Sequence, residues 1–111
     1  MKKETLTVEK DECGRIIYRN ASGEIHNPHG AAFIWANSCK AYWIKGKLHN
    51  PNGPAVIYAN GDKLYYTNGQ LHNENGPAIV WANGKKEYWI NDKLLNKTDF
   101  KTWQAEQTTP K

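Results

Sequence analysis

A unit of 23 residues occurs three times in succession, and this repeat constrains the fold more than any other feature of the sequence. The three copies span residues 23–45, 46–68 and 69–91 and follow one another without a gap. A partial copy at 14–22 precedes them and another at 92–96 follows. Because so short a unit cannot bury its own apolar residues, such repeats stack on their neighbours in a quasi-one-dimensional array.

Each copy contains two short strand patterns separated by turns. In the second copy, residues 55–59 and 63–67 are rich in β-branched and aromatic residues, which favour strands. The pairs Asn60-Gly61 and Asn68-Gly69 predict two type I′ hairpin turns, because both residues of such a turn need a positive φ. We therefore predict a mainly β fold, an elongated antiparallel meander of hairpin repeats, as a single domain over residues 1–106.

Alternation along the strands assigns the side chains to two faces of the sheet. One face should carry small and aliphatic residues such as Ala55 and Ile57, and the other should carry larger ones such as Val56 and Tyr58. A sheet of one layer leaves an aromatic face uncovered, and an exposed apolar patch of that size marks an interface. The predicted partner-binding residues are Trp35, Trp43, Tyr58, Tyr66, Trp81 and Trp89.

The C-terminal segment breaks the repeat pattern. Thr98 is a plausible N-cap, and Phe100 and Trp103 are spaced to share one face of a helix. We predict a short helix over 98–106 that covers the last hairpin, as repeat arrays need terminal caps. Residues 107–111 are predicted to form a flexible tail.

Two motifs resemble known families. The spacing Tyr66-x-x-Gly69-x-x-His72 is similar to that of MORN repeats, although the MORN pattern has a glycine soon after the histidine. The string His49-Asn-Pro-Asn-Gly-Pro-Ala55, which recurs at 72–78, more closely resembles a short repeat of many small phage and prophage proteins, as does the ending at 93–100. The resemblance covers about residues 14–106 and implies a MORN-like architecture. It also implies a phage or bacterial origin with a role in host takeover or counter-defence, whereas MORN arrays imply protein scaffolding and lipid contact.

Lysines recur in register with tyrosines two residues further along each return strand. Residues i and i+2 of a strand share a face, so a row of lysines should lie beside a row of tyrosines. With a net charge of +4, such a surface could neutralise phosphates and stack bases. The pattern favours the simpler interpretation, in which lysine stems lie over rings on a solvated face. The alternative site for a nucleic acid or nucleotide comprises Lys40, Lys63, Lys86, Tyr42, Tyr65 and Tyr88.

The repeated histidines His26, His49 and His72 are expected to have a structural role. Each precedes an asparagine in a turn and has no cysteine or acidic ligand at a matching position, so we expect it to hydrogen-bond the loop backbone rather than to hold a metal. Cys13 and Cys39 occupy non-equivalent positions, and we expect free thiols. No nucleophile–base motif or phosphate-binding glycine loop is apparent, so we expect no enzyme activity, cofactor or metal.

The remaining expectations concern location and partners. The sequence has no run of about 18 apolar residues and no apolar segment behind its charged start, so we expect no membrane span and a cytoplasmic location, in the host cell if the chain is phage-encoded. The leading hypothesis is a protein-interaction module that binds and modulates or inhibits a host protein, with a host or phage protein as partner. A nucleic-acid binder and a structural homo-oligomer, such as a homodimer, are the alternatives.

Overall fold

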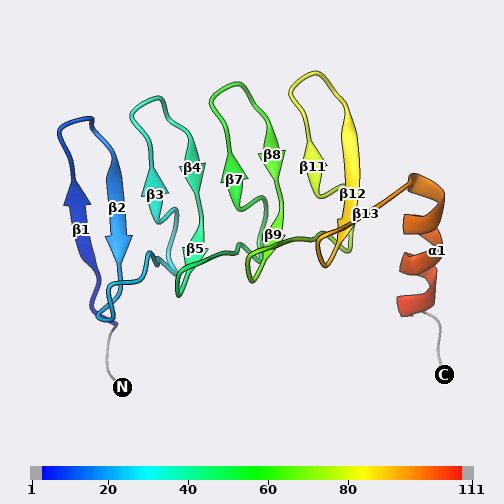
Figure 1. Ribbon diagram of the computed structural model, residues 1–111, viewed down its shortest axis with the longest axis horizontal. Helices are drawn as coiled ribbons and strands as arrows, with labels where there is room; N and C mark the ends of the chain where they lie inside the picture. The colour runs from blue at the N-terminus through cyan, green and yellow to red at the C-terminus, as the bar shows by residue number, and fades with distance from the viewer. Residues whose placement is uncertain (1–3, 109–111) are drawn as a thin grey trace.

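The computed structural model describes residues 4–108, in which hairpins stand side by side in the order of the chain (Figure 1). All strand pairings are antiparallel, and one nine-stranded sheet has the order β1-β2-β3-β4-β7-β8-β11-β12-β13, which confirms the predicted meander. The strands of this sheet are β1 (Thr7–Lys10), β2 (Ile16–Arg19), β3 (Phe33–Ile34), β4 (Lys40–Ala41), β7 (Val56–Ile57), β8 (Lys63–Leu64), β11 (Ile79–Val80), β12 (Lys86–Ile90) and β13 (Lys93–Leu95).

Each full repeat supplies an upper hairpin to this sheet, and smaller lower hairpins beneath it span the boundaries between successive repeats. In these lower hairpins, β5 (Trp43–Ile44) pairs with β6 (Lys47–Leu48), and β9 (Tyr66–Thr67) pairs with β10 (Gln70–Leu71). In the first two repeats the return strand is interrupted at Tyr42 or Tyr65, so that its second half leaves the main sheet. In the last repeat β12 runs without a break and pairs with both β11 and β13.

The same Asn-Gly dipeptide forms two different turns. At the lower turn, Asn68 and Gly69 have φ values of 49° and 83° between paired residues Thr67 and Gln70, so the predicted type I′ turn is confirmed. At the upper turn only Gly61 has a positive φ, and the loop contains three residues closed by the bond from Tyr58 N–H to the Asp62 carbonyl. The type I′ prediction at Asn60-Gly61 is therefore wrong, since this loop is a type I turn followed by a left-handed glycine.

The C-terminal helix α1 (Lys97–Thr108) stands at the end of the row of hairpins (Figure 1). It includes residues 107 and 108 of the predicted tail, and 109–111 lie outside the described residues. The predicted N-cap, Thr98, is wrong by two residues, because Asn96 Oδ1 accepts the Asp99 N–H at 2.8 Å. Asn96 occupies the register of the asparagines that follow the repeated histidines, so the helix begins where the next loop would have begun.

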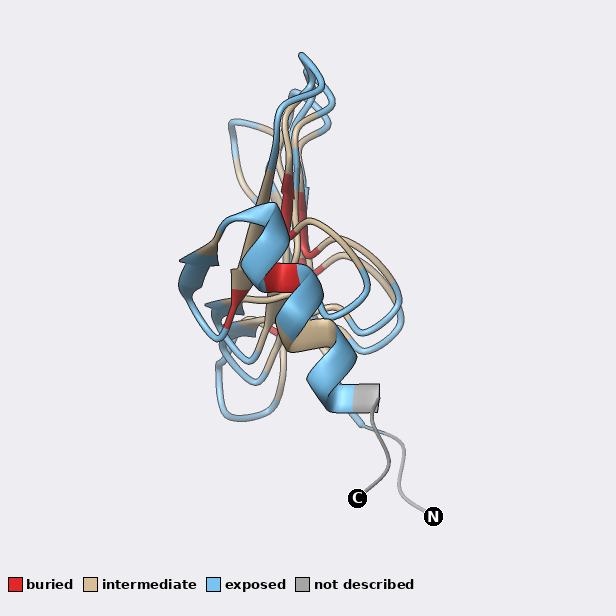
Figure 2. Cartoon of the chain, turned by 90° about the vertical axis from the view of Figure 1, so that its right-hand side faces the viewer, coloured by how far each residue is buried: buried red, intermediate tan, exposed pale blue. Residues whose placement is uncertain are grey.

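The hairpins form a thin blade with extents of 47 × 39 × 17 Å, seen edge-on from the helix end in Figure 2. So thin a layer buries few side chains completely. The fully buried alanines Ala32, Ala55 and Ala78 lie at the same position of successive repeats, directly after the histidine loops. The other buried apolar residues are Ala41, Val56, Ile79, Ile90 and Phe100. The core is therefore a narrow line along the row of repeats rather than a layer between two sheets.

Candidate functional site

One face of the sheet carries an apolar row that crosses six strands. Residues that pair directly across an antiparallel sheet point to the same side, so the register fixes the members of this row. Phe33 pairs with Ala41, which pairs in turn with Val56, and glutamates stand at both ends of the row. In strand order the row is Glu9, Ile17, Phe33, Ala41, Val56, Leu64, Ile79 and Glu87. We call this side the aromatic face, because the rings flanking the row belong to it.

The predicted partner-binding rings flank this row on the same face. Trp35 packs on Phe33 with ring centroids 4.1 Å apart, and Val56 and Ile79 within the row are 8% and 5% exposed. Five of the six predicted residues are half-buried, and Tyr58 is the exception at 44% exposure. The aromatic face therefore covers much of itself, and it offers solvent fewer whole rings than the sequence pattern indicated.

Glu87 joins two of the predicted rings. Its carboxylate accepts the indole N–H of Trp89 at 2.9 Å and that of Trp81 at 3.4 Å, which places both tryptophans on the aromatic face. The equivalent positions in the other repeats hold Leu64 and Ala41, and the indole N–H of Trp43 is buried without a hydrogen-bond partner among the described residues. The repeat pattern gave no sign of Glu87, because the other copies have apolar residues there.

Tyr66 lies in an apolar and weakly negative setting on the same face. Burial raises the pKa of its hydroxyl, and the neighbouring Tyr58 and Asp92 raise it further. The neutral hydroxyl is thus favoured in the folded protein.

Two shallow hollows flank Trp81 on the aromatic face. One, of about 400 Å³, lies between Tyr58 and Trp81 and has Leu64 and Cys39 in its wall. The other, of about 480 Å³, lies beyond Trp81 and is lined by polar groups that include Lys85 and Glu87. Trp81 therefore stands as a ridge between a mainly apolar hollow and a second one with more polar side chains in its wall, near the tips of the upper hairpins. Asn60 and Asp62 line both hollows.

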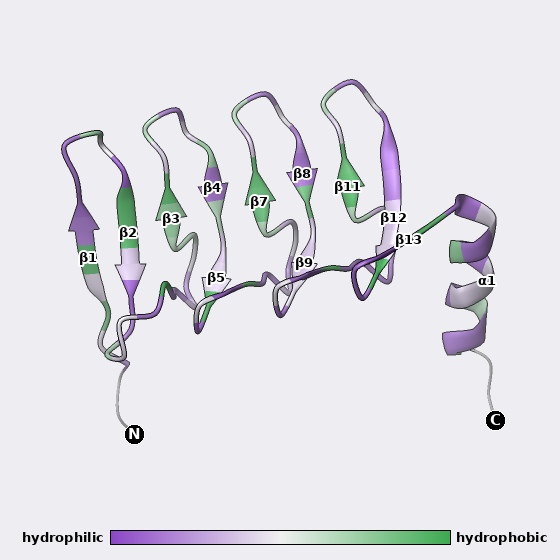
Figure 3. Cartoon of the chain, viewed as in Figure 1, coloured by the Kyte–Doolittle hydropathy of each residue, from purple (hydrophilic) through white to green (hydrophobic). Residues whose placement is uncertain are grey.

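The opposite side, which we call the lysine face, carries a row in which lysines alternate with aliphatic residues. Lys40 pairs with Ile57, which also pairs with Lys63, so the predicted lysines do lie in one row across the sheet. Figure 3 shows the matching alternation of apolar β3, β7 and β11 with hydrophilic segments of β4, β8 and β12. In strand order the row is Lys10, Ile16, Ile34, Lys40, Ile57, Lys63, Val80 and Lys86. Lys10 was missed from the sequence because β1 lies outside the repeat.

The predicted tyrosines lie next to this row but are not equivalent. Tyr42 and Tyr65 each line a groove between successive asparagine loops, of about 620 and 640 Å³. At Tyr88, by contrast, the ring of Phe100 in α1 packs on the tyrosine at a centroid distance of 4.8 Å. The helix thus covers the last member of the tyrosine row and leaves the first two open.

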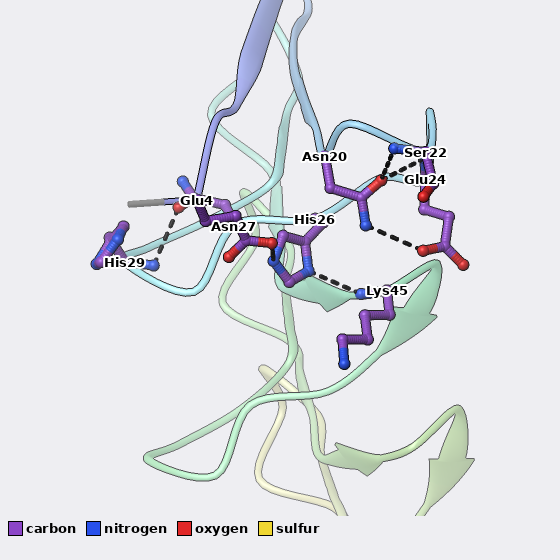
Figure 4. Close-up of polar contacts among 8 residues, drawn as sticks. All are labelled: Glu4, Asn20, Ser22, Glu24, His26, Asn27, His29 and Lys45. Carbon is purple, nitrogen blue, oxygen red and sulfur yellow. Dashed lines mark hydrogen bonds and ion pairs between the residues drawn. The ribbon is translucent and has the colours of Figure 1, made fainter. Parts of the chain in front are cut away.

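The repeated histidines are structural, as predicted. The Nδ1 atoms of His26, His49 and His72 accept the backbone N–H groups of the residues 19 positions later, at 2.8, 3.0 and 3.0 Å. Figure 4 shows His26 held between Lys45 and Glu4. Glu4 Oε1 lies 2.6 Å from Nε2 of His26, but at an angle that leaves this nitrogen without a hydrogen bond. Each histidine therefore ties its own loop to the next lower turn.

The asparagine after each histidine closes the loop that follows. Asn50 Oδ1 accepts the Asn52 N–H at 3.1 Å, and its amide group donates to the Pro54 carbonyl at 2.9 Å. Asn73 makes the equivalent bonds in the third repeat, at 3.0 and 2.9 Å. The His-Asn-x-x-Gly-Pro motif thus encodes a loop scaffold, and its polar side chains are occupied by the backbone.

The cysteines are free thiols, as expected. Cys39 Sγ accepts the Ala59 N–H of the next repeat at 3.2 Å, and Asp62 Oδ1 accepts the Ala82 N–H in the same way at 2.6 Å. Cys39 is therefore part of the bonding between hairpin tips. Over residues 4–108, no group of three or more histidine, cysteine or acidic side chains is arranged to hold a metal ion.

No described helix has the length and hydropathy needed to cross a membrane. Comparisons with family models, with curated protein sequences and with solved structures find no match to this chain.

Proposed function

We propose that this chain is a non-enzymatic protein-interaction module that binds a partner protein on its aromatic face, with Tyr58 and Trp81 as the central contacts. The observation that carries the proposal is the exposure of Tyr58 beside the apolar hollow that it shares with Trp81. Tyrosine and tryptophan are the residues most enriched among those that dominate binding energy at protein interfaces. Their rigid rings also lose little conformational entropy on binding.

The surroundings of this pair support a protein as the partner. The apolar row beneath the rings has charged residues only at its ends, Glu9 and Glu87. Glu9 is paired with Arg19, and Glu87 accepts hydrogen bonds from two indoles, so neither presents an isolated charge to a docking surface. An apolar centre with polar groups at its rim is the usual arrangement of a protein interface.

The resemblance to phage and prophage repeat proteins supports a bacterial host protein as this partner, with inhibition or modulation of that protein as the outcome and the host cytoplasm as the place. A second copy of the chain is the competing occupant of the same face. The two differ in a simple property, since a self-associating chain has a molar mass above the 12.7 kDa of the monomer at working concentration.

The test is capture of partners from nuclease-treated bacterial lysate by tagged wild-type protein and by Tyr58→Ala. Truncation of a central interface tyrosine costs about 2 kcal/mol or more, or about thirtyfold in affinity, so we expect the specific partner to be lost. Because Tyr58 is largely exposed, the thermal midpoint should change little.

The matched control is Val8→Ala, which removes another exposed apolar side chain but lies on the lysine face. This variant should retain the partner. Equal capture by Tyr58→Ala and the wild type would refute the proposed site. A dimeric mass by light scattering that becomes monomeric in Tyr58→Ala would assign the aromatic face to self-association instead.

A further inference from the structure

The lysine face has a charge distribution that the aromatic-face interaction does not use. Its strand row carries four lysines, Lys10, Lys40, Lys63 and Lys86, and all four are exposed. None of them forms an ion pair with any described residue, since the four ion pairs of the described chain involve only arginines and histidines as cations.

No carboxylate neutralises this row from within the sheet. Every strand residue that the register places on this side of the main sheet between β1 and β12 is aliphatic, aromatic or lysine. The acidic strand residues Glu9 and Glu87 point to the aromatic face. The strand residues of the sheet therefore separate their charges, with the lysines on this side. In the loops below the strands, Glu74 lines the Tyr65 groove, where its carboxylate lies 2.9 Å from His72 Nε2.

Three of the four lysines are regularly spaced because they belong to the repeat, and Lys10 extends the row at its N-terminal end. Lys40 and Lys63 are two strands apart, as are Lys63 and Lys86, which corresponds to about 10 Å in each case at the usual spacing between strands. The row from β1 to β12 crosses eight strands and is about 34 Å long on the same basis. Such a line of charge suits a long, flexible polyanion better than a compact ligand.

Aromatic grooves lie beside the row at the same period. The grooves of Tyr42 and Tyr65 are separated by one repeat, and each has a lysine two residues before its tyrosine, Lys40 and Lys63. Stacking on aromatic rings requires bases with free faces, which a single strand offers and a duplex does not.

We propose that the lysine face binds single-stranded nucleic acid laid across the strands, with phosphates near Lys10, Lys40, Lys63 and Lys86 and bases in the grooves of Tyr42 and Tyr65. This activity is independent of the partner-binding site on the aromatic face. The helix α1 ends the site, because Phe100 packs on Tyr88, the third tyrosine of the row.

The test is binding of a fluorescent oligothymidine of about 20 nucleotides, followed by anisotropy between 50 and 200 mM salt. For a single strand, the slope of log K against log salt is about −0.7 per phosphate contact, so four lysines predict a slope of about −3. The variant Lys40→Gln/Lys63→Gln/Lys86→Gln should reduce the slope to about −1 and weaken binding about tenfold or more at the lower salt.

The control variant removes the same charge from elsewhere. Lys45→Asn/Lys85→Gln/Lys97→Gln changes an exposed lower turn, a hairpin tip and the start of the helix, and both triple variants lower the net charge from +4 to +1. The control should retain the slope and most of the affinity. Equal losses in both variants would overturn the proposal, because they would show a dependence on net charge alone.

Two other ligands complete the experiment. Duplex DNA of the same length and vesicles containing phosphatidylserine should bind more weakly than the single strand. Equal or tighter binding of either would overturn the single-strand assignment and would identify the lysine face as a surface for that other polyanion. Loss of oligonucleotide binding in the lysine variant with the protein partner of Tyr58 retained would show that the two faces act separately.

Discussion

The two faces of this sheet are made by the same strands, but each face shields its apolar residues from water in a different way. On the aromatic face, Trp35 packs on Phe33, which is itself part of the apolar row, and Val56 and Ile79 of the same row are buried. On the lysine face, Ile34, Ile57 and Val80 stay half-buried between lysines, whose long stems can shield apolar surface while their charges stay in water.

This difference explains how a blade 17 Å thick can fold without a partner sheet. Each repeat brings its own cover on both sides, with rings on one and lysine stems on the other, and only the ends of the row need separate caps. The faces are therefore chemically distinct surfaces, one apolar and one basic, and this distinction underlies the two binding proposals.

Adjacent residues of β7 provide the sharpest test, because Val56 and Ile57 point to opposite faces. Val56→Asp puts an unpaired carboxylate under the aromatic layer and should cost about 3 kcal/mol or more. Ile57→Asp places the same charge between Lys40 and Lys63 and should cost only about 1 kcal/mol. Urea unfolding of the two variants measures the contrast, and equal costs would mean that the faces are not distinct.

Phe100 of α1 covers Tyr88 at the C-terminal end of the lysine face. Phe100→Ala removes a ring that is 3% exposed and packs on Tyr88, and it should lower the free energy of unfolding by about 3 kcal/mol. Loss of helical circular dichroism at a lower temperature than the loss of the strand signal would show the cap separating first. The exposed neighbour in Lys101→Ala is the control and should change stability by less than about 0.5 kcal/mol.

The histidine bonds tie each histidine loop to the lower turn at the end of the same repeat. His49→Ala leaves the Asn68 N–H without its acceptor and should destabilise the protein by about 1–2 kcal/mol. His29, which is exposed and not repeated, provides the comparison, and His29→Ala should be close to neutral. Thermal unfolding distinguishes the two, and a neutral His49→Ala would remove the structural role assigned to the repeated histidines.

The smallest effect concerns pH and the aromatic face. Burial, with Tyr58 and Asp92 nearby, raises the pKa of Tyr66 above its ordinary value near 10, so the unfolded chain loses this proton first as pH rises. The contribution of Tyr66 to stability is therefore complete below about pH 10 and declines above it. In Tyr66→Phe, the part of the loss of stability at high pH that comes from this hydroxyl should disappear. Urea unfolding midpoints measured from pH 8 to 11 test this, and the same dependence of the midpoint on pH as in the wild type would contradict the assignment.

Much of the candidate site followed from alternation within single strands. The assignment of Trp81 and Trp89 to one side and of Lys40, Lys63 and Lys86 to the other needs only the period of two along a strand and the period of 23 along the chain. Lys10 and Glu87 could not be found in this way, because one lies outside the repeat and the other replaces an apolar residue within it.

The sequence also could not predict how exposed each ring of the aromatic face is. Tyr58 and Trp81 occupy the same repeat position, yet Tyr58 is exposed and Trp81 is half-buried, with its indole N–H directed to Glu87. Which ring a partner could reach depends on neighbours that come from other strands, and a pattern along one strand contains no information about them.

By itself, the sequence determined the repeat unit, the strands and their two faces, and the structural use of the histidines, because these depend on local geometry and on a motif stated three times. The tertiary structure decided the rest. Asn60-Gly61 and Asn68-Gly69 form different turns because the pairing of the flanking strands sets the loop length. Asn96 caps a helix, whereas Asn50 and Asn73 close loops, because residues 97–108 lack the repeat pattern and form α1.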